Sequence, residues 1–138
     1  MTNEQAARAI YEQVFDRGNM RVLEQVMSEH YIQHEGSGQG DRASFGMFTA
    51  WPQQLRRSFP DLRFEVVASS VDTTGDVWLH ARFTGTHLGE YAGIAPTGKA
   101  IEVNMLDRLK FRDGKVVEHW GATDFTSLMR QLGAAVPW

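Results

Sequence analysis

The sequence predicts an α+β fold in which a curved antiparallel or mixed sheet is wrapped by N-terminal helices into a cone. Two observations lead to this prediction. Apolar residues recur at helical spacing up to residue 59, whereas the chain from residue 62 onward reads as successive strands separated by turns. A length of 138 residues suits one domain with its own core, so we expect residues 1–138 to form a single domain.

The first expected helix begins close to the N-terminus. Thr2 or Asn3 can cap it, because their side chains accept hydrogen bonds from the first turn. Its apolar positions include Tyr11 and Phe15, and Gly18 suits its end. These features indicate an amphipathic helix whose apolar stripe faces the rest of the domain.

Two more helices are expected before the strands. A short helix over residues 20–27 leads into an extended piece at 30–34 and a glycine-rich loop. Asp41 is the expected cap of a third helix that runs to about Phe59. Pro52 lies inside that pattern and should kink or split the helix.

The second half of the chain alternates between apolar runs and turn residues. Strands are expected at residues 62–71, 77–86, 100–111 and 116–124. The last two runs flank Asp113-Gly114, a hairpin signal in which glycine supplies a positive φ. A short helix begins near Phe125. The interior of such a cone is a natural site for a small molecule.

Composition narrows the classes of function. The chain is 42% hydrophobic and 22% charged, as in ordinary soluble globular proteins. It has no cysteine, which excludes thiolate chemistry and suits a cytoplasmic location. No apolar run approaches the roughly 18 residues that span a bilayer, so no membrane contact is expected. A formal net charge of −3 argues against a nucleic-acid partner.

Asp124 ends the last predicted strand and has two interpretations. It shares a face with Trp120, and a carboxylate beside an indole could be a general base in an apolar pocket. It could equally cap the helix that begins near Phe125. His119 has the opposite strand parity, so we place it on the outer face or at an interface.

Asp107 is the one charged residue in an otherwise apolar row of strand 100–111. A charge in such a row is rarely buried without a partner, and Arg82 or Arg108 could form a structural ion pair with it. Alternatively, Asp107 lines the pocket together with Asp124. The pKa values of two carboxylates in one cavity would move apart, so that one group could act as an acid and the other as a base.

The remaining polar candidates are histidines and the arginine on strand 77–86. His34 follows the second helix and is either an acid or base or a loop histidine bonded to the backbone. His80 and Arg82 share a face with Trp78, which is either solvated or turned toward a polar cavity. His30 and His34 lie four residues apart, but their segment reads as extended and no third ligand is evident, so we expect no metal site.

Large apolar side chains are the candidate pocket walls, although residues of these types are more often plain core. Together with His80, the expected substrate-binding residues are Tyr11, Phe15, Met47, Trp51 and Trp120. No motif for nucleotide binding or serine hydrolysis occurs, and no cofactor is expected.

The C-terminal part of the chain resembles a known family. The runs PTGK at 96–99, DRLKFRDGKVVEHW at 107–120 and QLG at 131–133, together with Asp124, resemble the SnoaL-like polyketide cyclases. That family belongs to the nuclear transport factor 2-like superfamily of α+β barrels. The resemblance extends over most of the chain. It implies a cone whose interior takes a small hydrophobic substrate that contains carbonyl groups.

The resemblance also implies a reaction and an assembly. It implies cofactor-free aldol ring closure in biosynthesis, with Asp124 as general acid and base and His34 or Arg82 as the donor to an enolate. The alternatives are epoxide hydrolysis or isomerisation by Asp107, Arg82 and Asp124, or ligand binding without catalysis. A homodimer is expected, since this superfamily often forms one and residues 136–138 end in an apolar Trp.

Overall fold

The structure is a computed structural model that describes the backbone of residues 1–35 and 45–135 and the side chains of residues 1–34 and 50–135. The predicted cap Asp41, most of the glycine-rich loop and the tail at 136–138 lie outside the described residues. Within the described ranges, every helix is too short or too polar to cross a bilayer.

The N-terminal helix is capped by Thr2, which is one of the two residues expected in this role. The Thr2 hydroxyl accepts a hydrogen bond from the Gln5 N–H, and the Gln5 side chain accepts one from the Thr2 N–H. Helix α1 (Asn3–Ala9) then widens into a π-helix, η1 (Ile10–Phe15). Gly18 adopts a φ of 71° just after it, a conformation in which glycine avoids the strain of a Cβ.

The next three elements return the chain toward the sheet. Helix α2 (Met20–Val26) leads directly into strand β1 (Met27–Glu35), which is longer than the extended piece that the sequence predicts. Helix α3 (Phe45–Ser58) contains Pro52 and is one continuous element, which excludes the split and leaves the kink as the remaining expectation. The capping of α3 falls outside the described residues.

Five strands form one mixed, open sheet. The remaining strands are β2 (Arg63–Val71), β3 (Val77–Thr86), β4 (Ala100–Arg112) and β5 (Lys115–Thr123). Their order is β1-β5-β4-β3-β2, with β1 parallel to β5 and every other pair antiparallel. The hairpin between β4 and β5 turns at Asp113 and Gly114, both at positive φ. These elements confirm the predicted α+β fold.

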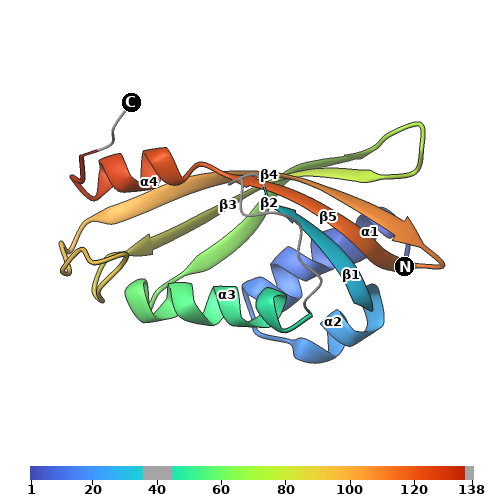
Figure 1. The fold of residues 1–138 in the computed structure, drawn as a ribbon, viewed down its shortest axis with the longest axis horizontal. Helices are drawn as coiled ribbons and strands as arrows, with labels where there is room; N and C mark the ends of the chain where they lie inside the picture. Colours follow the sequence, from blue (N-terminus) through green and yellow to red (C-terminus); the bar gives the residue numbers. More distant parts are fainter. Residues whose placement is uncertain (36–44, 136–138) are drawn as a thin grey trace.

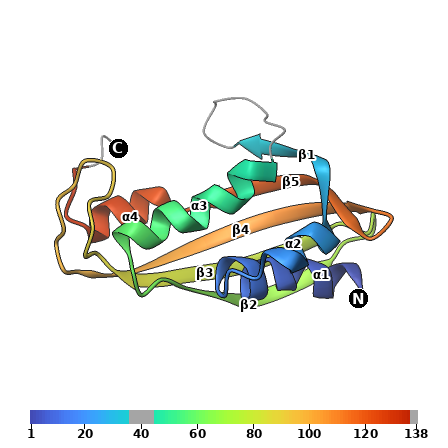
Figure 2. The ribbon, with the colours of Figure 1, turned by 90° about the horizontal axis from the view of Figure 1, so that it is seen from below.

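The sheet has one covered face and one open face. Helices α1, α2 and α3 lie on the same side of it, and α4 (Phe125–Gln131) lies at the opposite end of the sheet from α1 (Figures 1 and 2). Side chains of a strand point alternately to the two faces of the sheet, and the apolar rows of β3 and β4 point to the covered face, which we call the inner face. The buried members of these rows are Val77, Leu79, Ala81, Phe83, Ile101, Val103, Met105 and Leu109.

Candidate active site

A buried polar cluster lies within the apolar inner face. Tyr11 of η1 donates a short hydrogen bond to Oδ2 of Asp107 on β4. Nε2 of His119 on β5 lies 3.3 Å from the same oxygen and 3.5 Å from the Tyr11 hydroxyl. Nδ1 of His119 lies 2.7 Å from Oε1 of Gln33 on β1. Four elements thus bring together a tyrosine, a carboxyl group, an imidazole and an amide.

The contacts of this cluster determine where its protons lie. With the carbonyl oxygen of Gln33 facing it, Nδ1 of His119 carries a proton and donates. Nε2 then lies 3.3 Å from Oδ2 of Asp107. If neither atom carried a proton, the lone pair of Nε2 would face a negatively charged carboxylate oxygen. A proton on either of these two atoms would bridge the two groups. A buried carboxyl group beside an imidazole has the composition that general acid–base chemistry uses.

Tyr11 acts as a fixed donor within the cluster. Burial raises the pKa of the Tyr11 hydroxyl well above its ordinary value, and the charge of Asp107 and the hydrogen bond to it raise that pKa further. The phenol therefore stays protonated and holds the Asp107 carboxyl in one orientation. Its position depends on the π-helix, whose wider turn is seen in the hydrogen bond from the Asp16 N–H to the Tyr11 carbonyl.

The second oxygen of Asp107 has a different environment. Asp107 is 2% exposed, and its Oδ1 accepts no hydrogen bond from the residues in the described ranges. A buried acceptor without a partner is costly, and such atoms are uncommon in folded proteins. Oδ1 is therefore the acceptor of the cluster whose hydrogen-bonding capacity is not satisfied by the described residues.

A β-bulge explains why His119 joins this cluster, against our expectation. A regular register from the turn would place Trp120 opposite Asp107. In the structure Lys110 pairs with Glu118 while Phe111 pairs with Val116, so the strand contains one extra residue. The shift places Gly121 opposite Asp107 and turns His119 inward, 6% exposed. The outer-face placement of His119 is thus wrong.

Asp124 lies outside the cluster, and the expected apolar pocket around it is wrong. Its exposed side chain accepts a hydrogen bond from the Ser127 N–H and caps α4. Its backbone N–H donates to the Asn104 carbonyl. The capping interpretation therefore describes where Asp124 is. The two carboxylates, Asp107 and Asp124, do not share a cavity, because they belong to opposite faces of the sheet.

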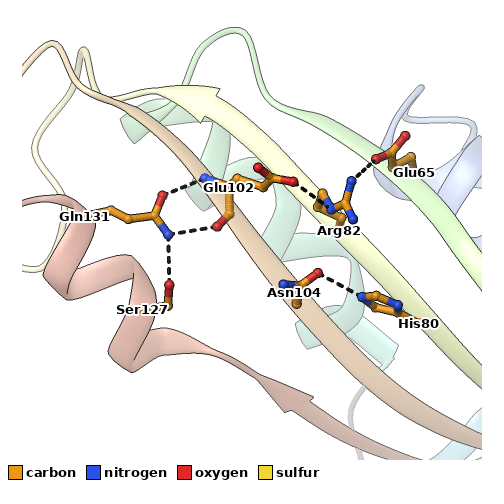
Figure 3. Close-up of polar contacts among 7 residues, drawn as sticks. All are labelled: Glu65, His80, Arg82, Glu102, Asn104, Ser127 and Gln131. Carbon is orange, nitrogen blue, oxygen red and sulfur yellow. Dashed lines mark hydrogen bonds and ion pairs between the residues drawn. The ribbon is translucent and has the colours of Figure 1, made fainter.

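Arg82 also lies on the open face, which we call the outer face. Its guanidinium bridges Glu65 at 3.1 Å and Glu102 at 2.9 Å, and His80 beside it contacts Asn104 at 2.8 Å (Figure 3). Arg82 is therefore no partner of Asp107. The predicted arrangement of Asp107, Arg82 and Asp124 is not assembled, so the basis for epoxide hydrolysis by these three residues is lost.

His34 and Trp120 belong to the outer face as well. Their rings stack at 4.6 Å with an interplanar angle of 11°. The Arg108 guanidinium lies 4.5 Å from the Trp120 ring and 5.5 Å from the Trp78 ring, and it pairs with Asp76 at 2.6 Å. Arg108 is thus no partner of Asp107 either. These outer-face groups lie on the opposite side of the sheet from the Tyr11–Asp107–His119 cluster.

The other predicted wall residues belong to the inner face. Phe15 is buried and its ring contacts Tyr11 at 5.1 Å and Trp51 at 5.7 Å, both edge-on. Trp51 is half-buried and also contacts Phe83. The Met47 side chain lies outside the described residues. Among the side chains described, no group of three or more His, Asp or Glu gathers to hold a metal ion.

Sequence reasoning missed Gln33 and His119 and found Tyr11 only as an apolar wall. In hindsight Gln33 could be identified from its place next to His34, because consecutive residues of a strand face opposite sides of a sheet. The signal for Asp107 was present in the sequence, because its row is otherwise apolar. The bulge that brings His119 beside it had no such signal.

Comparison with known proteins gives one consistent family. The sequence profile of the SnoaL-like polyketide cyclases matches residues 5–132. The chain is 34% identical over 97 residues to the aklanonic acid methyl ester cyclase AcmA of Streptomyces galilaeus, covering 68% of this chain and 62% of AcmA. The chain thus spans less than two thirds of that relative.

Solved structures share the whole fold. IdmH of Streptomyces antibioticus, a proposed polyketide cyclase, superposes with a TM-score of 0.82 at 28% identity, covering 97% of this chain and 100% of IdmH. AclR of Streptomyces galilaeus, a proposed hydroxylase, gives a TM-score of 0.77 at 27% identity, covering 96% of this chain and 98% of AclR. The same scaffold therefore occurs with different assigned reactions.

Proposed function

The chain belongs to the SnoaL-like polyketide cyclase family, and we propose that it closes a ring in a small hydrophobic carbonyl substrate by a cofactor-free aldol reaction. The observation that supports this proposal is the buried Asp107–His119 pair, in which Nε2 of His119 lies 3.3 Å from Oδ2 of Asp107 and Nδ1 lies 2.7 Å from Oε1 of Gln33. We assign the acid–base role to Asp107 rather than to Asp124, because Asp124 is exposed and caps a helix. AcmA, the cyclase relative, supports a polyketide-type substrate.

In the proposed reaction Asp107 first takes up a proton from the substrate and later returns it to the product. Oδ1 of Asp107 takes a proton from the carbon alpha to a carbonyl, which leaves an enolate. The cluster then holds two protons, and the His119 imidazolium stabilises the enolate oxygen. The enolate carbon attacks a second carbonyl of the same molecule, forming the new C–C bond. Asp107 returns its proton to the alkoxide that results, so the protein is regenerated without a co-reactant.

Paired substitutions test this assignment. Asp107→Asn keeps the shape of the side chain but removes the base, and we expect turnover to fall by at least about 100-fold. Asp124→Asn keeps a good helix cap, so we expect turnover within about twofold of the wild type. The first assay substrate is aklanonic acid methyl ester, the compound in the name of the relative AcmA. The opposite result, with loss only in the Asp124 variant, would return the base to Asp124.

We further propose that the protein is a homodimer that associates through the outer face of the sheet. Two large apolar side chains are exposed on this face, Leu106 at 62% and Trp78 at 48%. Leu106 lies at the middle of the sheet, between His80 of β3 and Ala122 of β5. An apolar residue in the centre of an open sheet face favours burial against a second copy.

A further inference from the structure

Asp16 directly follows the π-helix η1 and joins it to two other elements. Its N–H donates to the Tyr11 carbonyl at 3.0 Å, the bond that closes the wide turn of η1. Its own carbonyl accepts from the Arg56 guanidinium of α3 at 2.7 Å. Its carboxylate accepts from the Arg63 side chain and from the Phe64 N–H of β2, each at 2.9 Å. Asp16 therefore fixes the end of η1 to both α3 and β2.

The Asp16 carboxylate is a buried acceptor, and its most important donor is a backbone amide. Its side chain is 7% exposed, whereas that of Arg63 is 73% exposed. An ion pair with so exposed a partner contributes little, so the bond from the Phe64 N–H matters more. Burial acts to raise the pKa of Asp16, but the hydrogen bonds from Arg63 and Phe64 outweigh it and lower that pKa. The carboxylate thus stays an acceptor for the backbone of β2.

Both ends of the segment α1–η1 are bound to this same strand. Near its start, the Ser69 hydroxyl of β2 donates to Glu4 at 2.8 Å and accepts from Arg8 at 3.2 Å. At its end, Asp16 accepts from Phe64. A shift of η1 by one residue into regular α-helical pairing would rotate one end against the other by about 100°. Two contacts to one strand resist that rotation, so they favour the π-helix.

Tyr11 depends on the wide turn for its place in the polar cluster. Its carbonyl accepts from the Asp16 N–H, while its hydroxyl donates to Oδ2 of Asp107 on β4. One residue therefore connects the end of η1 to the carboxyl group to which we assign the acid–base role. If η1 shifted, the hydroxyl would move relative to Asp107, because Asp107 is held by the sheet.

We propose that Asp16 is a positioning residue for the polar cluster: its hydrogen bond from β2 retains the π-helix, and the π-helix holds the Tyr11 hydroxyl on Asp107. The effect of Asp16 on turnover rests on the proposed function, because it passes through the proposed base. The position of the Tyr11 hydroxyl can be measured without turnover.

The hydroxyl proton of Tyr11 reports this position. A phenol proton in a strong, charge-assisted hydrogen bond to a buried carboxylate resonates far downfield in a proton NMR spectrum, and its loss in Tyr11→Phe identifies it. Asp16→Glu keeps the charge but has a longer side chain, which displaces the end of η1 from the Phe64 N–H. Asp16→Asn loses the charge but keeps the shape and an acceptor oxygen. These two variants separate geometry from charge.

Asp61→Glu is the matched control. The Asp61 carboxylate accepts from the Thr86 N–H at 2.7 Å and from the Thr86 hydroxyl at 2.8 Å, so it also binds a strand through a backbone amide. Thr86 ends β3, whereas Leu79, which pairs with Asp107, lies near the start of that strand. The control therefore makes the same chemical change away from the polar cluster.

We expect Asp16→Glu to shift the Tyr11 proton upfield or abolish its signal, and to lower turnover by at least about tenfold. Asp16→Asn and Asp61→Glu should keep the signal in place and turnover within about twofold of the wild type. Asp16→Ala removes the acceptor without added bulk, so it should act as Asp16→Glu does and replaces that variant if the latter does not fold.

Three results would overturn the positioning role. One is a wild type without the Tyr11 signal, and another is an equal change of the signal in Asp16→Asn or in Asp61→Glu. The third is an unchanged signal in Asp16→Glu together with a lower unfolding free energy in urea, because Asp16 would then only stabilise the fold.

These results are separate from the test of the proposed function. Full turnover in Asp107→Asn would end the aldol assignment, while the Tyr11 signal would still decide the role of Asp16. Conversely, loss of turnover in Asp107→Asn with an unchanged Tyr11 signal in Asp16→Glu would retain the base and remove the positioning role.

Discussion

Tyr11 shows how one buried residue couples the π-helix to the polar cluster. Its hydroxyl is fully buried and donates to Asp107 across a sequence separation of 96 residues. Burial, followed by the charge and hydrogen bond of Asp107, raises the pKa of this phenol well above 10.0. The folded state therefore keeps Tyr11 protonated under conditions in which the unfolded chain would ionise it.

Replacing Tyr11 by Phe should have a pH-dependent effect on stability. Near neutral pH the loss of a buried hydrogen bond to a carboxylate should cost about 1–3 kcal/mol of unfolding free energy. Above the ordinary tyrosine value of 10.0 the unfolded wild type releases a proton that the folded state retains, so wild-type stability falls as pH rises. The difference between wild type and variant should therefore narrow above this pH. Urea unfolding on both sides of it makes the comparison, and a difference independent of pH would contradict it.

At the scale of elements, α4 depends on Asp124 for its start. This helix has only seven residues, so a single cap is a large share of its stabilisation. Asp124→Ala removes the acceptor for the Ser127 N–H and should lower the unfolding free energy by about 1 kcal/mol. Asp124→Asn should restore most of it, because Asn is an equally good cap. Equal stability of both variants and wild type in thermal unfolding would show that the cap contributes nothing.

Helix α4 also covers a free edge of β4. Strand β5 ends at Thr123, and beyond it the Gln131 side chain accepts from the Glu102 N–H and donates to the Glu102 carbonyl, each at 2.8 Å (Figure 3). The Gln131 amide thus takes the place of a peptide group on a neighbouring strand. An edge satisfied in this way is not available for pairing with another chain.

Gln131→Met keeps the length of the side chain and removes both bonds to β4. Because water reaches this exposed edge, we expect a cost of only about 1 kcal/mol in urea unfolding. Ser127→Ala is the matched control, since it removes only the bond within α4 from Gln131 to the Ser127 hydroxyl. The control should cost less than half as much. A larger effect of the control would mean that Gln131 acts within the helix and not on the strand.

The periodicity of the strands was enough to predict the inner rows of β3 and β4, but not the faces of β5. The apolar row that contains Asp107 identified the inner face of β4 correctly. The error came from β5, where one extra residue near Val116 reverses the expected alternation. Nothing in the apolar run of β5 distinguishes a bulged strand from a regular one. His119 and Asp124 were therefore assigned to the wrong environments although their opposite parity was right.

At the scale of the whole molecule, the order of helices and strands was enough to predict the fold class. Helices first and strands later is the pattern of an α+β domain, and the structure follows it except that β1 lies between α2 and α3 and α4 follows β5. The parallel pairing of β1 with β5 was not predictable from local pattern, because it joins segments at opposite ends of the chain. That pairing brings Gln33 beside His119 and so completes the polar cluster. The site is thus a product of long-range topology.

The last prediction concerns assembly through the outer face of the sheet. Leu106 is 62% exposed at the centre of this face, and a homodimer formed through it would bury that side chain. Leu106→Glu would then place a charge inside the interface, which should shift the protein from dimer to monomer. Leu88→Glu is the control, because Leu88 is 58% exposed but lies after β3, away from the sheet. Light scattering coupled to gel filtration gives the mass of each. A monomeric wild type, or a Leu106→Glu variant that remains dimeric, would exclude association through this face.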